Sequence, residues 1–245
     1  MKLRPTGGAG MKITMIGHST VLLETGTTKI LADPYFRTSG FGAYARITPP
    51  FKTAQEMLYV DLVLVSHGHW DHCDYEFIRL LAAKTLVIAP KGLVSTLRRN
   101  GSAVVSGMGA WEEKRFGDVK VTAVPASHIV PTQGYVVEAD GKTAYFAGDT
   151  YYRAFHKEIG KRFRLDVALI PVSTYRIPMT MGERGALKAV KDLSPKIVIP
   201  IHLGIRPILP VMRTKESPER FRQSVKISGL ETEVVILREG EHLTI

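Results

Sequence analysis

The stretch of sequence that decides the fold is Asp61-Leu62-Val63-Leu64-Val65-Ser66-His67-Gly68-His69-Trp70-Asp71-His72. Residues 62–65 form a short aliphatic run, which is typical of a strand buried on both faces. Three histidines and one aspartate follow directly. Because a core strand immediately precedes them, a solvated histidine-rich loop explains them poorly. The stretch therefore predicts a functional site at the end of a buried strand.

The spacing of these polar residues suits metal coordination. His67 and His69 stand two apart on an extended chain, so their side chains point the same way and can hold one cation. Asp71 and His72 come after the turn and can reach a second cation beside the first. Neutral imidazole and carboxylate are the ligands expected for Zn²⁺, Mn²⁺ or Fe²⁺.

Three more polar residues end apolar segments farther along the chain, namely His128, Asp149 and His202. Any one of them alone would more often be a hydrogen-bonded structural residue. Three such residues in one chain, beside the motif at residues 67–72, favour a larger metal shell.

The order His-x-His-x-Asp-His, a strand-end histidine, Gly-Asp-Thr and a final strand-end histidine resembles the metallo-β-lactamase superfamily over residues 11–237. The resemblance implies an α/β fold (α+β in some schemes), namely a four-layer αβ/βα sandwich with the site at the sheet edges between its halves. It also implies a ligand set for two metals: His67, His69 and His128 for the first, Asp71, His72 and His202 for the second, and Asp149 bridging both.

Finer features narrow the resemblance to one branch. The segments 16–20, 30–34 and 195–202 are similar to simple one-domain hydrolases related to ascorbate-6-phosphate lactonase and N-acylphosphatidylethanolamine phospholipase D. True β-lactamases of this fold lack the bridging aspartate, and the flavodiiron branch carries Glu where this chain has His69. The β-CASP nucleases insert a domain before the last histidine, where only residues 150–201 are available here.

Composition and patterning indicate one globular domain. The 245 residues are 44% hydrophobic and 23% charged, which excludes a disordered chain. Strands are predicted at 12–16, 21–24, 29–32, 61–66, 85–89, 119–126, 133–139, 143–147, 167–171, 196–200 and 234–237, and helices at 75–83, 93–99, 182–193 and 218–227. Two groups of strands with their own helices predict two sheets packed face to face with helices outside.

Three segments have individual features. Asp140-Gly141 is a strong hairpin signal between two predicted strands. Residues 35–52 read as a long surface loop, either a lid over the site or a mobile connection. Residues 1–10 are expected to be a flexible tail, and 11–245 a single hydrolase domain.

Six further residues are candidates for supporting or substrate-binding roles: His18, Asp33, Tyr151, Tyr175, Arg206 and Arg213. His18 stands where a strand meets a loop, and it either lines the cleft or bonds to a neighbouring turn. In the resembling family the aspartate at the position of Asp33 supports the ligand loop. The tyrosines follow strands and border the pocket, whereas the arginines lie on an irregular segment suited to a substrate clamp.

Charge and cysteine content bear on partners and compartment. The formal net charge of +10 suits an anionic or phosphorylated small molecule, although it also suits solubility alone. The single cysteine, Cys73, cannot form an intrachain disulfide, and residues 1–10 hold no apolar secretion signal, so the cytoplasm is the expected compartment. The apolar runs are too short for a transmembrane segment.

These features predict a dinuclear metal-dependent hydrolase in which a metal-bridging hydroxide attacks a phosphodiester, a lactone or a carboxylic ester. Asp71 is expected to pass a proton to the leaving group, and Asp149 to fix the metal separation. Zn²⁺ or Mn²⁺ are the preferred metals, with Fe or Ni as further candidates. The alternatives are a nuclease acting on nucleic acid, a non-catalytic metal-binding protein of the same fold, and a single-iron oxygenase.

Overall fold

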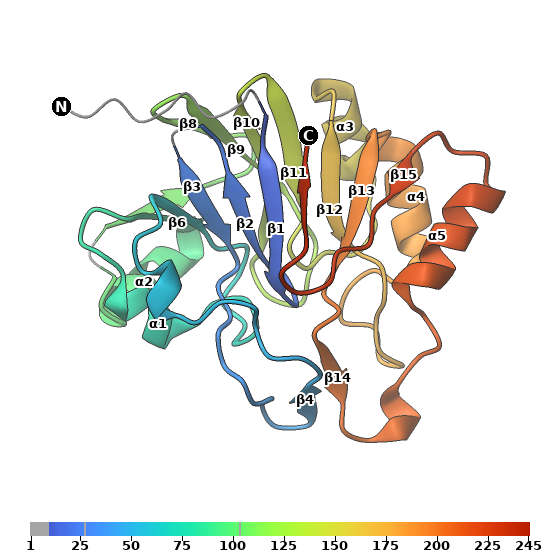
Figure 1. The fold of residues 1–245 in the computed structure, drawn as a ribbon, viewed down its shortest axis with the longest axis horizontal. Helices are drawn as coiled ribbons and strands as arrows, with labels where there is room; N and C mark the ends of the chain where they lie inside the picture. Colours follow the sequence, from blue (N-terminus) through green and yellow to red (C-terminus); the bar gives the residue numbers. More distant parts are fainter. Residues whose placement is uncertain (1–9, 27, 103) are drawn as a thin grey trace.

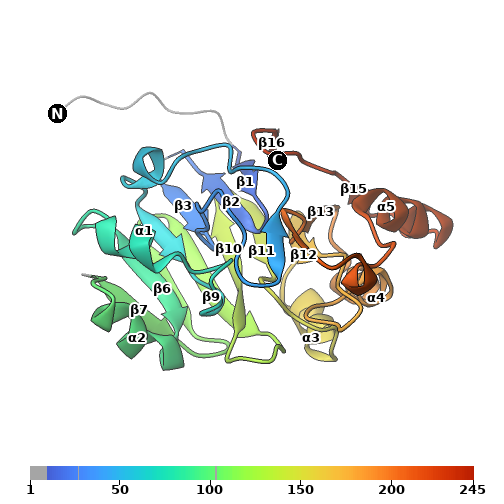
Figure 2. The same ribbon diagram turned by 90° about the horizontal axis from the view of Figure 1, so that it is seen from below.

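The computed structural model describes residues 10–26, 28–102 and 104–245. Within them, two seven-stranded sheets pack face to face, with helices on both outer sides (Figure 1). The view from below separates the helices of the N-terminal half from those of the C-terminal half (Figure 2). This arrangement confirms the four-layer sandwich. The expected tail lies outside the described residues except for Gly10, which is buried.

The first sheet is built from the N-terminal half and one C-terminal strand. Its strands are β1 (Lys12–Gly17), β2 (Thr20–Glu24), β3 (Lys29–Ala32), β5 (Leu62–Leu64), β6 (Leu86–Pro90), β7 (Val105–Met108) and β16 (His242–Thr244). They are ordered β16-β1-β2-β3-β5-β6-β7, and β3, β5, β6 and β7 run parallel. The residues that follow β3 and β5 therefore meet at one edge of the sheet.

The second sheet is ordered β15-β13-β12-β11-β10-β9-β8. Its strands are β8 (Glu113–Phe116), β9 (Val119–Pro125), β10 (Gln133–Ala139), β11 (Lys142–Phe146), β12 (Val167–Pro171), β13 (Ile197–Ile201) and β15 (Glu233–Val234). Strands β9, β11 and β13 point the same way, because β10 is antiparallel to both β9 and β11 and β11–β13 are parallel. Their ends carry His128, Asp149 and His202 to a common edge.

The main core lies between the two sheets, where alternate residues of each strand face inward. Ile13, Leu64, Val121, Phe146 and Leu169 are all buried there. Burying an aliphatic or aromatic side chain of this size contributes roughly 1.5–3 kcal/mol to folding. This shared core fixes the two sheets, and with them the strand ends.

Helices cover the outer face of each sheet. Helices α1 (Tyr75–Leu80) and α2 (Val94–Arg99) pack on the first sheet, and α3 (Phe155–Arg162), α4 (Glu183–Leu193) and α5 (Pro218–Ile227) pack on the second. Among the described residues, no helix is both long enough and apolar enough to pass through a membrane.

A small two-stranded sheet corrects the interpretation of residues 35–52 as a wholly irregular loop. β4 (Tyr44–Arg46) pairs with β14 (Ile205–Pro207) below the sandwich in Figure 1. The Arg46 guanidinium donates to the carbonyl oxygens of Tyr35, Arg37 and Thr48, which braces the segment. The prediction missed this strand because its partner lies far along the chain.

Other element boundaries also differ from the predicted ones. The helix expected at 75–83 ends at Leu80, and the strand expected at 234–237 is the two-residue β15. Strands β7, β8, β14 and β16 were not predicted. The hairpin signal is confirmed, since Asp140 and Gly141 have φ angles of 51° and 70°, as a type I′ turn requires.

Gly148 lets the two sheets approach each other beside the predicted site. Its φ is 56°, and an added Cβ would overlap the Cβ and Oγ of Ser66. Both the backbone conformation and the space therefore require glycine at the residue before Asp149.

The Gly148→Ala variant is predicted to unfold at lower denaturant concentration, with a loss of about 3 kcal/mol from strain and overlap together. Gly141→Ala is the matched control, because Gly141 has a similar φ but nothing lies within 4 Å of an added Cβ. That control should lose only about 1 kcal/mol. Equal losses in the two variants would contradict a close approach at Ser66.

Candidate metal centre

The seven predicted ligand residues meet at the edge where β5, β9, β11 and β13 end. Six of them, with His18, form two groups in which the donor atoms lie within 4.8 Å of one another, and a third such group, Asp33, His67 and His72, joins a residue of each. The first group is His67, His69 and His128, and the second is His18, Asp71, His72 and His202. This division matches the two ligand sets that the resemblance implied, apart from the added His18.

Asp149 lies between the two groups and contacts both. Its Oδ1 is 3.4 Å from His72 Nε2, and its Oδ2 is 3.3 Å from His202 Nε2. The same Oδ2 is 3.9 Å from His128 Nε2, in the first group. One carboxylate can therefore serve two cations at once.

Asp33 orients two of the histidines by accepting hydrogen bonds from His72 and from Ser66 beside His67. It follows β3 with φ 41°, and its carboxylate accepts from Ser66 N (2.7 Å), Ser66 Oγ (2.6 Å) and His72 Nδ1 (2.7 Å). Because the Ser66 hydroxyl proton points to Asp33, Ser66 Oγ accepts from His67 Nδ1 at 2.9 Å. Both imidazoles then carry a proton on Nδ1, which leaves each Nε2 lone pair free to bind a cation.

His18 faces Asp71 and supports it. The backbone N–H of Gly204 donates to His18 Nδ1 (3.1 Å), so in the neutral ring the proton sits on Nε2. That Nε2 lies 3.3 Å from Asp71 Oδ2. A protonated nitrogen offers no lone pair to a metal, so His18 is suited to orienting Asp71. Burial lowers the pKa of His18 to about 3, which keeps the ring neutral.

Burial and the neighbouring charges shift the pKa values of the cluster in different directions. Burial holds the pKa of His67 well below its ordinary value and lowers that of His128 to about 4. For His72, burial is outweighed by the carboxylates of Asp149 and Asp71, which raise its pKa. Burial alone would raise the pKa of Asp149, but His202 and His72 hold it well below its usual range.

Several buried polar atoms of the cluster have no hydrogen-bond partner among the described residues: His67 Nε2, His72 Nε2, His128 Nδ1, Asp149 Oδ1 and His202 Nδ1. Buried polar atoms are normally paired, because leaving one unpaired costs free energy. Imidazole nitrogens and carboxylate oxygens in this arrangement are the donor set of divalent transition metals. The residues present therefore fit divalent cations.

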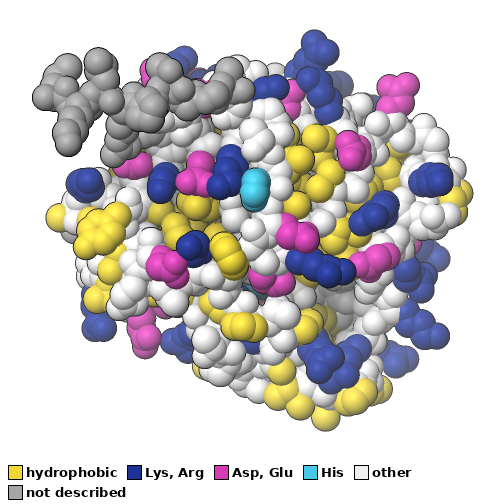
Figure 3. All heavy atoms as spheres, viewed as in Figure 1, with side chains coloured by type: hydrophobic (Ala, Val, Ile, Leu, Met, Phe, Trp, Pro, Cys, Tyr) yellow, Lys and Arg dark blue, Asp and Glu magenta, His cyan; other side chains and the backbone are white. Residues whose placement is uncertain are grey.

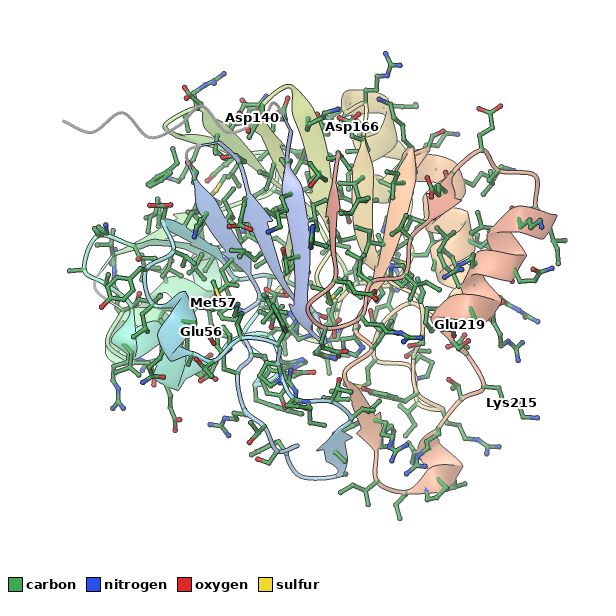
Figure 4. The ribbon with its side chains drawn as sticks, viewed as in Figure 1. Glu56, Met57, Asp140, Asp166, Lys215 and Glu219 are labelled. Atoms are coloured by element: carbon green, nitrogen blue, oxygen red, sulfur yellow. The ribbon has the colours of Figure 1, made fainter. Side chains whose placement is uncertain are left out.

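Two adjoining cavities open onto the cluster. The smaller, of about 130 Å³, is lined by cluster residues and by Tyr44, Trp70, Tyr175, Met179 and Ile205. The larger, of about 410 Å³, shares Tyr175, His202 and Ile205 with it and extends toward α5, whose Glu219 lies at the lower right of Figure 4. A substrate can therefore place its reacting group at the cluster and a larger substituent beside it.

The residues predicted to contact substrate line different cavities. Tyr175 lines both cavities, whereas Arg206 and Arg213 line only the larger one. Arg213 donates from Nε to the carbonyl of Pro207 and from Nη2 to that of Ile208, so it braces the loop after β14. Tyr151 donates its hydroxyl to the carbonyl of Pro178, and its ring lies 6.1 Å from that of His128.

Sequence reasoning missed four residues of the smaller cavity: Tyr44, Trp70, Met179 and Ile205. Trp70 stands inside the motif at residues 67–72, so its position was a usable signal. Tyr44 and Ile205 reach the site through the pairing of β4 with β14. No local pattern in the sequence indicates that pairing.

The Asp33→Asn variant is predicted to weaken metal binding about 10- to 100-fold, because the amide has one acceptor oxygen where the carboxylate uses two for Ser66 N, Ser66 Oγ and His72 Nδ1. Metal affinity of the purified variant measures this directly. Asp166→Asn is the control, since Asp166 accepts from Thr143 N and Lys196 Nζ at the opposite end of the sheets (Figure 4). Unchanged affinity in Asp33→Asn would show that the carboxylate does not orient the ligands.

Comparison with known proteins identifies the family. Residues 28–203 match the model of the β-lactamase superfamily domain. The chain is 33% identical over 247 residues to a UPF0173 metal-dependent hydrolase of Archaeoglobus fulgidus, covering 94% of this chain and 97% of that protein. It is 34% identical to a UPF0173 metal-dependent hydrolase of Pelotomaculum thermopropionicum, covering 95% and 99%.

A solved structure is similar over nearly its whole length. Igni18, a metallo hydrolase from Ignicoccus hospitalis, superposes with a TM-score of 0.77 at 25% identity, covering 96% of this chain and 98% of that one. With the matches in sequence, this likeness shows that the chain belongs to the metallo-β-lactamase superfamily and, within it, to the UPF0173 family of metal-dependent hydrolases.

Proposed function

We propose that the chain is a dinuclear metal-dependent hydrolase that cleaves an ester-type bond, either a phosphodiester or a lactone or carboxylic ester. The observation that carries this proposal is the pair of donor groups, one buried and one partly buried, that Asp149 joins beside a cavity. The UPF0173 relatives, which match almost the whole chain and are named metal-dependent hydrolases, support the reaction class.

The two donor groups support one set of metal ligands. His67, His69 and His128 would hold one cation, Asp71, His72 and His202 the other, and Asp149 both. Zn²⁺ or Mn²⁺ suits this mixture of nitrogen and oxygen ligands, with Fe²⁺ or Ni²⁺ as further candidates. When bound, two such cations supply Lewis acidity and lower the pKa of water in the site.

The side chains of the protein orient these groups and manage protons. Asp33 and Ser66 keep the Nδ1 protons of His72 and His67 in place, so that Nε2 of each ring faces the site. His18 holds its protonated Nε2 3.3 Å from Oδ2 of Asp71, whose carboxylate lines the smaller cavity. Asp71 is thereby placed to pass a proton to a leaving group bound there.

A small-molecule substrate fits the two cavities better than a nucleic acid does. On the face seen in Figure 3, Lys and Arg side chains are interspersed with Asp and Glu and form no continuous basic groove. A nuclease would favour such a groove along the phosphate backbone. A non-catalytic binding protein is disfavoured because ligand-type residues fill all seven positions. The cytoplasm stays the expected compartment, on the strength of the single, buried Cys73.

Hydrolysis of bis(p-nitrophenyl) phosphate, p-nitrophenyl acetate and a simple lactone by the Zn²⁺- or Mn²⁺-loaded protein tests the proposal. At least one substrate should turn over, and Asp149→Ala should lower that rate at least about 100-fold by removing the shared ligand. Asp140→Ala is the control, because Asp140 lies on the β10–β11 turn, far from the site (Figure 4). Unchanged turnover in Asp149→Ala would contradict the proposal. So would a metal-loaded wild-type protein that hydrolyses none of the three substrates.

A further inference from the structure

The hydroxyl of Tyr175 is buried and has no hydrogen-bond partner among the described residues. The surrounding segment does not use it. Thr174 accepts from the backbone N–H groups of Met179 and Thr180 through its hydroxyl, and its carbonyl accepts from the Thr214 hydroxyl. A buried tyrosine hydroxyl usually finds a partner, so an unpaired one in a cavity wall indicates a bound group that is supplied from outside.

The position of the Tyr175 ring is fixed from two sides. Its centroid is 5.1 Å from that of Tyr44 on β4 and 6.2 Å from that of His202 after β13. The ring also forms part of the wall between the two cavities. The ring is thus held in place, and the hydroxyl has no hydrogen bond among the described residues that a substrate oxygen would have to displace, which favours a donor that stabilises developing negative charge.

The side chains that line the smaller cavity bear on which substrate class it can bind. Apart from the metal-centre side chains, its described lining consists of Tyr44, Trp70, Tyr175, Met179 and Ile205, with no Lys or Arg. Phosphate groups are commonly held by Arg or Lys. Arg206 and Arg213 line the larger cavity instead. The side-chain walls around the reacting centre therefore supply no positive charge beyond that of bound cations, which suits the carbonyl group of an uncharged substrate.

We infer that the hydroxyl of Tyr175 donates a hydrogen bond to the carbonyl oxygen of an uncharged acyl substrate, a carboxylic ester or lactone. This inference rests on the proposed function and selects between its two bond types. In the reaction a new C–O bond forms to the oxygen of water, the acyl bond to the alkoxide oxygen breaks, and the proton lost by the water ends on that alkoxide. Tyr175 keeps its proton throughout and stabilises the charge that builds on the carbonyl oxygen.

The test compares Tyr175→Phe with Tyr145→Phe in the metal-loaded protein. Tyr145 is the matched control because its hydroxyl is also buried without a partner, but it lies in the core of the second sheet. With p-nitrophenyl acetate or a lactone, Tyr175→Phe should lower kcat about 100-fold while KM changes less than about threefold. Tyr145→Phe should keep the wild-type kcat.

A second readout is independent of turnover. Binding of a trifluoromethyl ketone, whose hydrate mimics the tetrahedral acyl intermediate, should weaken at least about tenfold in Tyr175→Phe, with the metal content unchanged. A smaller metal content in Tyr175→Phe would assign the tyrosine a structural role and overturn the inference. An unchanged kcat and unchanged ketone affinity would do the same.

The remaining outcomes separate this inference from the proposed function. A wild-type protein that hydrolyses only bis(p-nitrophenyl) phosphate would uphold the hydrolase and overturn the acyl substrate. A wild-type protein with both metals bound that hydrolyses no substrate would overturn the proposed function, and the role of Tyr175 with it. Ester or lactone hydrolysis that depends on Tyr175 supports both.

Discussion

The carboxylate of Asp33 is the contact on which the rest of the site depends. It joins the end of β3 to the end of β5 through Ser66, and it orients His72 directly and His67 through the Ser66 hydroxyl. Because one of these histidines belongs to each of the two proposed ligand sets, and Asp33 forms a group with both, one buried carboxylate orients a ligand of each set. Because Gly148 has no side chain, the second sheet can approach Ser66 closely at this point.

The cost of this arrangement explains why it needs a cation. Burial removes water from imidazoles and carboxylates, several of whose nitrogen and oxygen atoms then have no hydrogen-bond partner among the described residues. The shifted pKa values of His72 and Asp149 reflect that mutual dependence, since the carboxylates of Asp149 and Asp71 raise the pKa of His72 while His202 and His72 lower that of Asp149. A ligand that binds only the folded state stabilises it, so the centre that reacts also contributes to the stability of the loaded fold.

Much of the metal centre could be predicted from sequence because its residues follow strands. His67, His128, Asp149 and His202 come after apolar runs, and the parallel direction of β9, β11 and β13 brings three of them together. The substrate walls could not be predicted in the same way. Tyr44 and Ile205 meet through strands that are remote in sequence. The hydrogen bond that the Tyr151 hydroxyl donates to the carbonyl of Pro178 likewise depends on tertiary structure.

The number and position of bound metal ions test the central claim most directly. The measurement is a crystal structure of the zinc-loaded protein with anomalous scattering at the zinc edge, together with elemental analysis of the same sample. The account predicts two ions per chain, one at His67, His69 and His128 and one at Asp71, His72 and His202, with Asp149 between them. A single ion, no ion, or a second ion bound away from Asp149 would contradict it.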